Sequence, residues 1–403
     1  MKIKTRFQLS FMMFLQYFIW GTWYITLNTY LGETLKFTGI EIGLSYGTFA
    51  IAAMISPFFV GLIADKFFST EKVLGVMHLL GSLLFILTAQ MKTFEYFYPC
   101  LLLYTLTYAP TMALSNSVSF HQMQDPGKQF PWIRVLGTFG WIAANQVIGI
   151  FDYGSSVNQL YVGAISSALL GVYSFSLPHV APKKDAQVTF REIIGLDALS
   201  LFKKRAFAIL FIASVLTCIP LSYYYSFTAS FLSDIGMKMN WIPRNMSMGQ
   251  MAEAAFLLVL PFFLKRYGIK NVFIIGMAAW LIRYLCFAYG DMGTWVWMIY
   301  LGILLHGLCY DFFFVAGQIY VDKEAPPHLK SSAQGMITFA TYGLGMFIGT
   351  WFAGMTVDLY TVNGVRAWSH LWLIPAGIAA IVLVMFIFIF KEKKNQETSA
   401  PPS

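Results

Sequence analysis

Long apolar segments recur along the whole chain, and their length limits what the chain can fold into. A helix that crosses the hydrocarbon core of a bilayer needs about 20 mostly apolar residues. Segments of this kind lie at residues 9–31, 40–64, 73–90, 96–119, 132–151, 159–178, 207–232, 246–264, 271–289, 294–320, 332–357 and 369–390. We therefore expect an all-α polytopic membrane protein with 12 transmembrane helices.

The composition excludes the main classes of water-soluble chain. Of the 403 residues, 58% are hydrophobic and only 11% are charged, whereas about a quarter of the residues of a soluble domain are charged. The four cysteines stand singly inside apolar segments, without the paired spacing of a metal site. We expect neither a metal nor an organic cofactor.

The distribution of basic residues predicts the topology. Most of the 27 Lys and Arg residues lie at the two termini or in alternate connections between the apolar segments. Because cytoplasmic loops carry the excess of positive charge, this pattern predicts that both termini are cytoplasmic. It also explains the net charge of +8 without a nucleic-acid partner.

The longest polar connection divides the segments into six and six. We expect an N-terminal six-helix bundle at 1–178, a cytoplasmic linker at 179–205, a C-terminal six-helix bundle at 206–390 and a polar cytoplasmic tail at 391–403. Within the linker, residues 190–202 fit an amphipathic helix at the membrane surface. Short charged connections at 61–72 and 263–272 take equivalent places in the two halves. Paired halves of this kind are typical of secondary transporters.

Of the 19 acidic residues, 17 fall in predicted loops, tails or helix ends, and the two that lie well inside apolar segments are Glu253 and Asp311. A charge at that depth costs at least a few kcal/mol, so such residues usually face a cavity and mark an ion or substrate path. Apolar surroundings favour the neutral form of a carboxyl group and a nearby cation favours its charged form, which suits a proton carrier. The alternative is a structural ion pair or a neutral hydrogen-bonded carboxyl group.

Polar side chains also share helical faces. Arg134, Thr138 and Trp141 recur at i, i+4 and i+7, with Asn145 four residues further on. Arginine offers a rigid fork of donors that suits a diol, a carbonyl or a carboxylate. We interpret this face as a binding surface; the alternative is that Arg134 snorkels towards cytoplasmic water.

Further faces of this kind occur in the second half. Gln250 and Glu253 share one face, as an amide beside a carboxyl group. Asp311 is predicted to share another with Phe314 and Gln318, beside Tyr310. The alternative in each case is a hydrogen bond between helices.

We expect two other polar residues to have structural roles. Arg283 has Trp280 and Tyr284 as neighbours, which predicts an anchor at the outer interface of the membrane. His306 is predicted to make an interhelical hydrogen bond.

Several motifs resemble known families. Gly61-Leu-Ile-Ala-Asp65-Lys66 is similar to the signature loop of the major facilitator superfamily. Within that superfamily the chain resembles the bacterial nucleoside:proton symporters. The resemblance rests on stretches such as Phe18-Ile-Trp-Gly-Thr-Trp23, Ile133-Arg-Val-Leu-Gly-Thr138, Pro261-Phe-Phe-Leu-Lys-Arg-Tyr-Gly-Ile-Lys-Asn271 and Asp311-Phe-Phe313.

The resemblance implies a major facilitator fold and a symporter that imports nucleosides with protons across the bacterial cell inner membrane by alternating access. The proton would be the coupling ion, carried by Glu253 or Asp311, and the protein would act as a monomer. Asp65 and Lys66 would form a gating loop. The implied substrate-binding residues are Arg134, Thr138, Trp141, Ser222, Tyr225, Gln250, Glu253, Tyr310 and Asp311.

One departure leaves the substrate open. The family pattern in the seventh segment carries amide side chains where this chain has Ser222 and Tyr225. A modified nucleoside or another sugar-bearing solute is therefore an alternative substrate. An enzyme is not expected, because the sequence lacks His-Glu-x-x-His and phosphate-loop motifs.

Overall fold

The computed structural model describes residues 2–59, 68–181, 196–326 and 329–390. The proposed gating residues Asp65 and Lys66, most of the linker, and the tail at 391–403 lie outside these ranges. In chain order the helices and strands are α1 (Ile3–Gly21), α2 (Leu27–Thr29), η1 (Tyr30–Thr34), α3 (Gly39–Phe59), α4 (Thr70–Gln90), α5 (Phe94–His121), α6 (Pro126–Ile150), α7 (Asn158–Ser174), η3 (Leu196–Lys203), α9 (Arg205–Asp234), η4 (Met239–Trp241), α10 (Ile242–Tyr289), α11 (Val296–Tyr310), η5 (Asp311–Val315), α12 (Ala316–Glu324), α13 (Lys330–Thr338), η7 (Phe339–Gly345), α14 (Met346–Leu359), β1 (Thr361–Val362), β2 (Val365–Arg366) and α15 (Trp368–Phe388).

Helical structure covers most of the described part of each predicted apolar segment, and the first segment is broken at residues 22–26, between α1 and α2. By length and hydropathy, 8 helical stretches among the described residues could cross a membrane. One of these stretches includes both predicted segments at 246–264 and 271–289, because α10 runs through them. The charged connection predicted between the two is therefore a kink within α10 rather than a loop. Gly268 makes the kink with φ 74° and ψ 165°, a conformation that favours glycine.

The linker shows a second local difference. The described part of the predicted surface helix is a 3₁₀ helix, η3, at Leu196–Lys203. Residues 190–195 of that prediction lie outside the described ranges.

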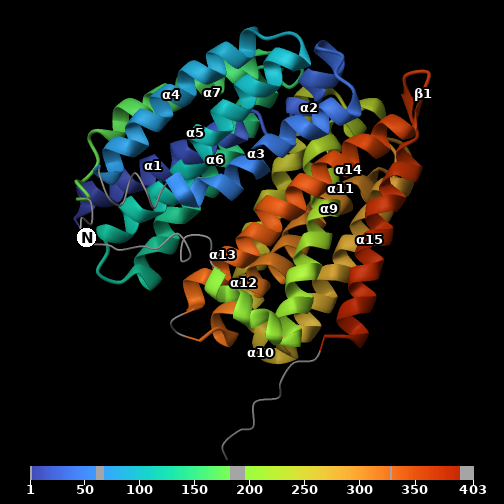
Figure 1. Ribbon diagram of the computed structural model, residues 1–403. Helices are drawn as coiled ribbons and strands as arrows, with labels where there is room; N and C mark the ends of the chain where they lie inside the picture. Colours follow the sequence, from blue (N-terminus) through green and yellow to red (C-terminus); the bar gives the residue numbers. More distant parts are fainter. Residues whose placement is uncertain (1, 60–67, 182–195, 327–328, 391–403) are drawn as a thin grey trace, which may run out of the picture.

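The helices form two groups (Figure 1): α1 to α7 gather on one side and α9 to α15 on the other. The groups meet where α3 packs against α14 and α6 packs against α10. A Cβ atom at Gly43 would lie 2.2 Å from the carbonyl oxygen of Thr350, and one at Gly354 would lie 2.3 Å from the carbonyl oxygen of Gly39. Glycines thus allow the backbones of α3 and α14 to touch.

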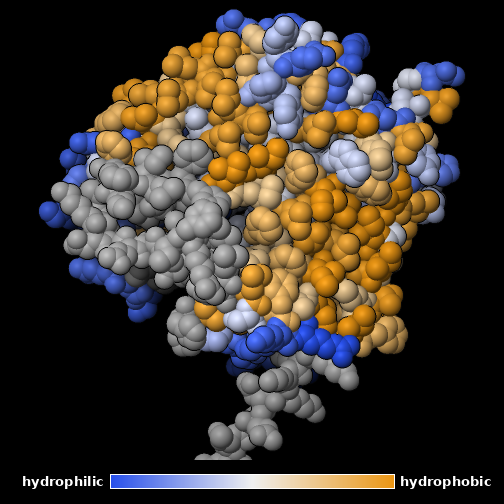
Figure 2. All heavy atoms as spheres, viewed as in Figure 1, coloured by the Kyte–Doolittle hydropathy of each residue, from blue (hydrophilic) through white to orange (hydrophobic). Residues whose placement is uncertain are grey.

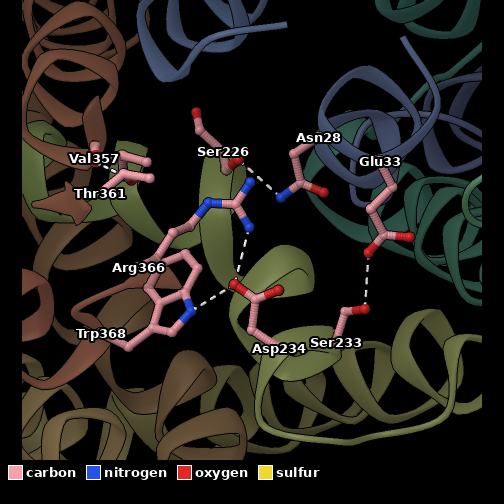
Figure 3. Close-up of polar contacts among 9 residues, drawn as sticks. All are labelled: Asn28, Glu33, Ser226, Ser233, Asp234, Val357, Thr361, Arg366 and Trp368. Carbon is pink, nitrogen blue, oxygen red and sulfur yellow. Dashed lines mark hydrogen bonds and ion pairs between the residues drawn. The ribbon is translucent and has the colours of Figure 1, made fainter. Parts of the chain in front are cut away.

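Hydrogen bonds between the groups gather at the end that carries the β1–β2 hairpin (Figure 3). The Asn28 amide donates to the carbonyl oxygen of Ser226 at 2.8 Å, and the Ser233 hydroxyl donates to Glu33 at 2.8 Å. Asn28 lies in α2 and Glu33 in η1, so both bonds connect the segment that follows α1 to α9. They hold the two groups together at this end of the molecule.

The same end carries a helix cap shared between the groups. The Asp358 carboxylate, at the end of α14, accepts hydrogen bonds from the backbone nitrogens of Gly39 at 2.5 Å and Ile40 at 2.8 Å. These are the first amides of α3, where the helix dipole favours a negative charge. Nearby, Arg244 of α10 donates to Gln146 of α6 at 3.3 Å.

The outer surface of the helices is apolar. Large side chains such as Ile165, Leu258 and Phe388 are exposed, and Figure 2 shows a broad hydrophobic surface over α14 and α15. A soluble monomer rarely exposes so large an apolar patch. The surface is that of a protein surrounded by lipid.

Candidate functional site

A pocket lies where the two groups of helices meet. Its cavity volume is about 130 Å³, which is below the roughly 300–1,000 Å³ of sites that hold a drug-sized ligand. It is lined by Tyr17, Trp20, Tyr24, Met112, Arg134, Gly137, Thr138, Trp141, Leu221, Tyr225, Gln250, Glu253, Tyr310, Tyr342 and Met346. A larger cavity lies within the second group between η3, α9 and α12, away from the intramembrane carboxyl groups.

The first group contributes the predicted face of α6. Arg134, Thr138 and Trp141 all line the pocket. The guanidinium carbon of Arg134 lies 4.0 Å from the centre of the Tyr17 ring. Asn145, at the far end of the predicted face, is buried and bonds the carbonyl oxygen of Trp141 instead. The Arg134 side chain therefore lies at the pocket, against the Tyr17 ring.

Aromatic rings from both groups form one wall of the pocket. The Trp20 and Trp141 rings meet edge to face with centres 5.1 Å apart, and the Tyr24 and Tyr225 rings lie 5.3 Å apart. The indole nitrogens of Trp20 and Trp141 are buried and have no hydrogen-bond partner among the described residues. They are donors available to a polar ligand. Aromatic residues are so common in this sequence that pattern alone did not single out Trp20 or Tyr24, although Trp20 lies in a stretch that carries the family resemblance.

The second group supplies hydroxyl, amide and carboxyl groups. Gln250, Glu253 and Tyr310, three of the predicted binding residues, line the pocket. Tyr342, which the sequence did not single out, also lines it and hydrogen-bonds Tyr310 through its hydroxyl. The Gln250 side-chain oxygen is buried without a partner in the described part of the chain. The Glu253 side chain is 32% exposed. The Glu253 carboxyl group can therefore interact with a ligand in the pocket and with polar groups in the protein interior.

Behind Glu253 lies a chain of polar contacts. The Glu253 carboxylate lies 3.9 Å from Nε2 of His306, and the Tyr225 hydroxyl lies 3.4 Å from the same nitrogen. Arg283 donates from Nη1 to Nδ1 of His306 at 3.0 Å. The prediction that Arg283 anchors the outer interface is wrong, because its side chain is 0% exposed. His306 makes the interhelical bond that was predicted for it.

Two glycines bring α10 and α11 close enough for these contacts. A Cβ atom at Gly307 would lie 2.3 Å from the backbone nitrogen of Glu253, and one at Gly249 would lie 3.1 Å from Cβ of His306. Small residues at helix interfaces permit this close packing. The positions of Glu253 and His306 are thus fixed by backbone contact.

Ser222 does not reach the pocket. Its side chain is fully buried, and the hydroxyl donates to the carbonyl oxygen of Cys218 in its own helix at 2.7 Å. Tyr225, three residues further along α9, lines the pocket. The structure therefore separates two residues that the family resemblance groups together.

Asp311 also lies outside the pocket lining. It is 1% exposed, and neither carboxyl oxygen has a hydrogen-bond partner among the residues that the structure describes. The π-helix η5 begins at Asp311, so α-helical spacing does not extend to Phe314 and Gln318. The predicted shared face is broken at this point, and Gln318 is exposed.

Comparisons with known proteins show the family of the chain. The family model described as "Nucleoside H+ symporter" matches residues 1–395. The protein YegT of Escherichia coli (strain K12) is 42% identical over 98% of this chain and 96% of its own length. Nucleoside permease NupG of the same organism is 37% identical, over 97% of both chains. The crystal structure of nucleoside transporter NupG superposes with a TM-score of 0.90 at 36% identity, covering 97% of this chain and 100% of that one.

Proposed function

Because the chain belongs to the nucleoside H+ symporter family, we propose that it carries nucleosides across the membrane together with protons by alternating access. The family and the similar proteins are transporters, which confirms the expectation that the chain is not an enzyme. The apolar helices make it a multi-pass membrane protein.

One observation carries the proposal: a single pocket unites a donor fork from the first group with a carboxyl group from the second. Arg134 and Glu253 both line it, with Gln250 beside Glu253. Arginine and amide groups suit a ribose diol and a nucleobase edge. The rings of Trp141 and Tyr225 offer faces on which a base can stack.

The proposed topology follows the distribution of basic residues. It has 12 spans, both termini in the cytoplasm of a bacterium, and bundles at 1–178 and 206–390 that move against each other in the inner membrane. The end bearing Glu33 and Asp358 then faces outward. Since hydrogen bonds join the bundles at that end, the structure corresponds to a stage closed to the outside.

Glu253 is our candidate for the proton carrier at the pocket, because it lines the pocket while Asp311 is buried away from it. Protonation of Glu253 from outside would allow substrate to bind and the bundles to rock. Release of the proton to the cytoplasm would then weaken substrate binding. Asp65 and Lys66 would act at the gate, with the proton as the only coupling ion and one chain as the working unit.

Transport by reconstituted protein tests this function. Liposomes containing the protein are given an inward proton gradient, and labelled uridine is followed with and without a protonophore. We expect uphill uptake that the protonophore abolishes. Folded protein that shows no proton-driven uptake of uridine, purine nucleosides or modified nucleosides would contradict the proposal.

The change of the family pattern at Tyr225 is the reason to extend the screen beyond uridine. Tyr225 lines the pocket and Ser222 does not, so a bulky phenol replaces one of the amides of the family pattern. A phenol reduces the space for the ligand and presents a single hydroxyl. After uridine, the screen proceeds to purine nucleosides, then to modified nucleosides, and last to other sugar-bearing solutes.

A further inference from the structure

A fully buried arginine lies behind the pocket in the second group of helices. The guanidinium carbon of Arg283 is 3.6 Å from the centre of the Tyr224 ring, and the rings of Trp280, Tyr284 and Phe287 surround it at 5.6–5.9 Å. Burying an arginine charge is costly unless partners offset it. Cation–π contacts supply part of that compensation.

The remaining polar contact of Arg283 is directed towards the pocket. Its Nη1 donates to Nδ1 of His306, whereas Nε and Nη2 have no hydrogen-bond partner in the described ranges. A guanidinium group only donates, so Nδ1 of His306 must accept and the ring proton lies on Nε2. Arg283 thereby fixes the tautomer of His306.

The fixed N–H of His306 faces two residues of the pocket lining. From Nε2 the Tyr225 hydroxyl is 3.4 Å away and the nearer Glu253 oxygen is 3.9 Å away. One donor therefore lies between a carboxyl group that can change charge and a phenol that can contact substrate. A small shift of Glu253 decides which of the two accepts this hydrogen.

We propose that Arg283 and His306 form a positioning relay that links the protonation of Glu253 to the hydrogen bonding of Tyr225. The proposal rests on the proposed function. When Glu253 is ionised, the N–H of His306 turns to the carboxylate, and the Arg283 charge supports it. When Glu253 carries the proton, the N–H is left to the Tyr225 oxygen, and the phenol hydrogen turns towards the substrate. No proton passes through His306.

Other charged and hydroxyl groups near Glu253 are compatible with this relay. Arg134 faces it from α6 of the first group, and Tyr310 and Tyr342 line the same pocket. Asp311 interacts with it electrostatically from η5. Arg134 moves relative to Glu253 when the groups rock, but Arg283 stays in the same group as Glu253. The relay is thus the fixed partner of the carboxyl group in every state.

Replacing the buried cation separates coupling from transport. In liposomes, Arg283→Met is compared with wild type for uphill accumulation of nucleoside and for exchange of internal against external nucleoside. Exchange does not require Glu253 to lose its proton, so we expect exchange within about twofold of wild type and an accumulation ratio that falls to one. Arg283→Lys, which keeps the charge, restores accumulation. Arg266→Met removes an exposed arginine and serves as the matched control.

A second variant covers misfolding of the first. His306→Phe keeps the stacking on Tyr224, whose ring centre is 4.9 Å away, but removes both ring nitrogens. We expect the same split between exchange and accumulation. Either variant accumulating nucleoside like wild type would overturn the relay. So would a parallel loss of exchange and accumulation, or a failure of Arg283→Lys to rescue, because these mark a purely structural role. Wild type that exchanges but never accumulates nucleoside would instead overturn the proposed function.

Discussion

Among the described residues, each group of helices buries one histidine, and the two histidines have different partners. In the first group, Nε2 of His78 lies 2.9 Å from the Gln16 side-chain oxygen and Nδ1 lies 3.1 Å from the Ser167 hydroxyl. In the second group, His306 lies between the Arg283 guanidinium and the Glu253 carboxyl group.

The difference separates a structural network from a functional one. Gln16 continues the first network by donating to Thr111 at 2.8 Å, so neutral hydrogen bonds join α1, α4, α5 and α7. Neither His78 nor Gln16 lines the pocket. The second network contains charges, leaves two Arg283 nitrogens without partners in the described residues, and ends at the pocket. Charge that is buried and incompletely paired beside a cavity indicates function.

The largest expected effect comes from removing the ionisable end of the second network. Glu253→Gln keeps the shape of the side chain but cannot bind or release a proton. We expect the accumulation ratio for nucleoside to fall to one in liposomes with an inward proton gradient. Glu95→Gln, which changes an exposed carboxyl group, should accumulate like wild type. Undiminished accumulation by Glu253→Gln would mean that the proton is carried elsewhere, with Asp311→Asn as the next variant.

Most of the binding residues predicted from the sequence line the pocket, and the predictions that failed did so for physical reasons. Helical spacing brought Arg134, Thr138 and Trp141 to one face because α6 is regular there. The π-helix at Asp311 adds a residue to the turn, which spacing cannot reveal. Arg283 beside aromatic residues is also typical of a membrane interface, so only its packing against Tyr224 and His306 distinguishes the two environments.

A second prediction concerns the wall of the pocket that belongs to the first group. Arg134→Lys keeps the charge but loses the bidentate fork and its planar contact with Tyr17. We expect the nucleoside concentration at half-maximal uptake to rise about tenfold, which is about 1.4 kcal/mol. The accumulation ratio should stay at its wild-type value, because the coupling contacts lie in the other group. Initial rates over a range of concentrations measure the first quantity, and a fall in the ratio would contradict the division between the groups.

The neutral network should affect stability without affecting coupling. His78→Leu removes two interhelical hydrogen bonds of about 0.6 kcal/mol each, so we expect unfolding free energy to fall by about 1 kcal/mol. Thermal unfolding in detergent measures the loss, and proton-driven accumulation should be unchanged. If His78→Leu uncoupled transport as His306→Phe is expected to do, the contrast between the two histidines would disappear.

The smallest expected effect tests one bond at the edge of the neutral network. Ser167 contacts the His78 ring and also donates to the His78 carbonyl oxygen at 2.9 Å. The neighbouring Ser166 donates only to the Val162 carbonyl oxygen of its own helix. Ser167→Ala should therefore lower stability by about 0.6 kcal/mol, and Ser166→Ala should lower it less, with transport intact in both. Equal losses would show that the hydroxyl contributes through its own helix. The bond between α4 and α7 would then not be what holds His78 in place.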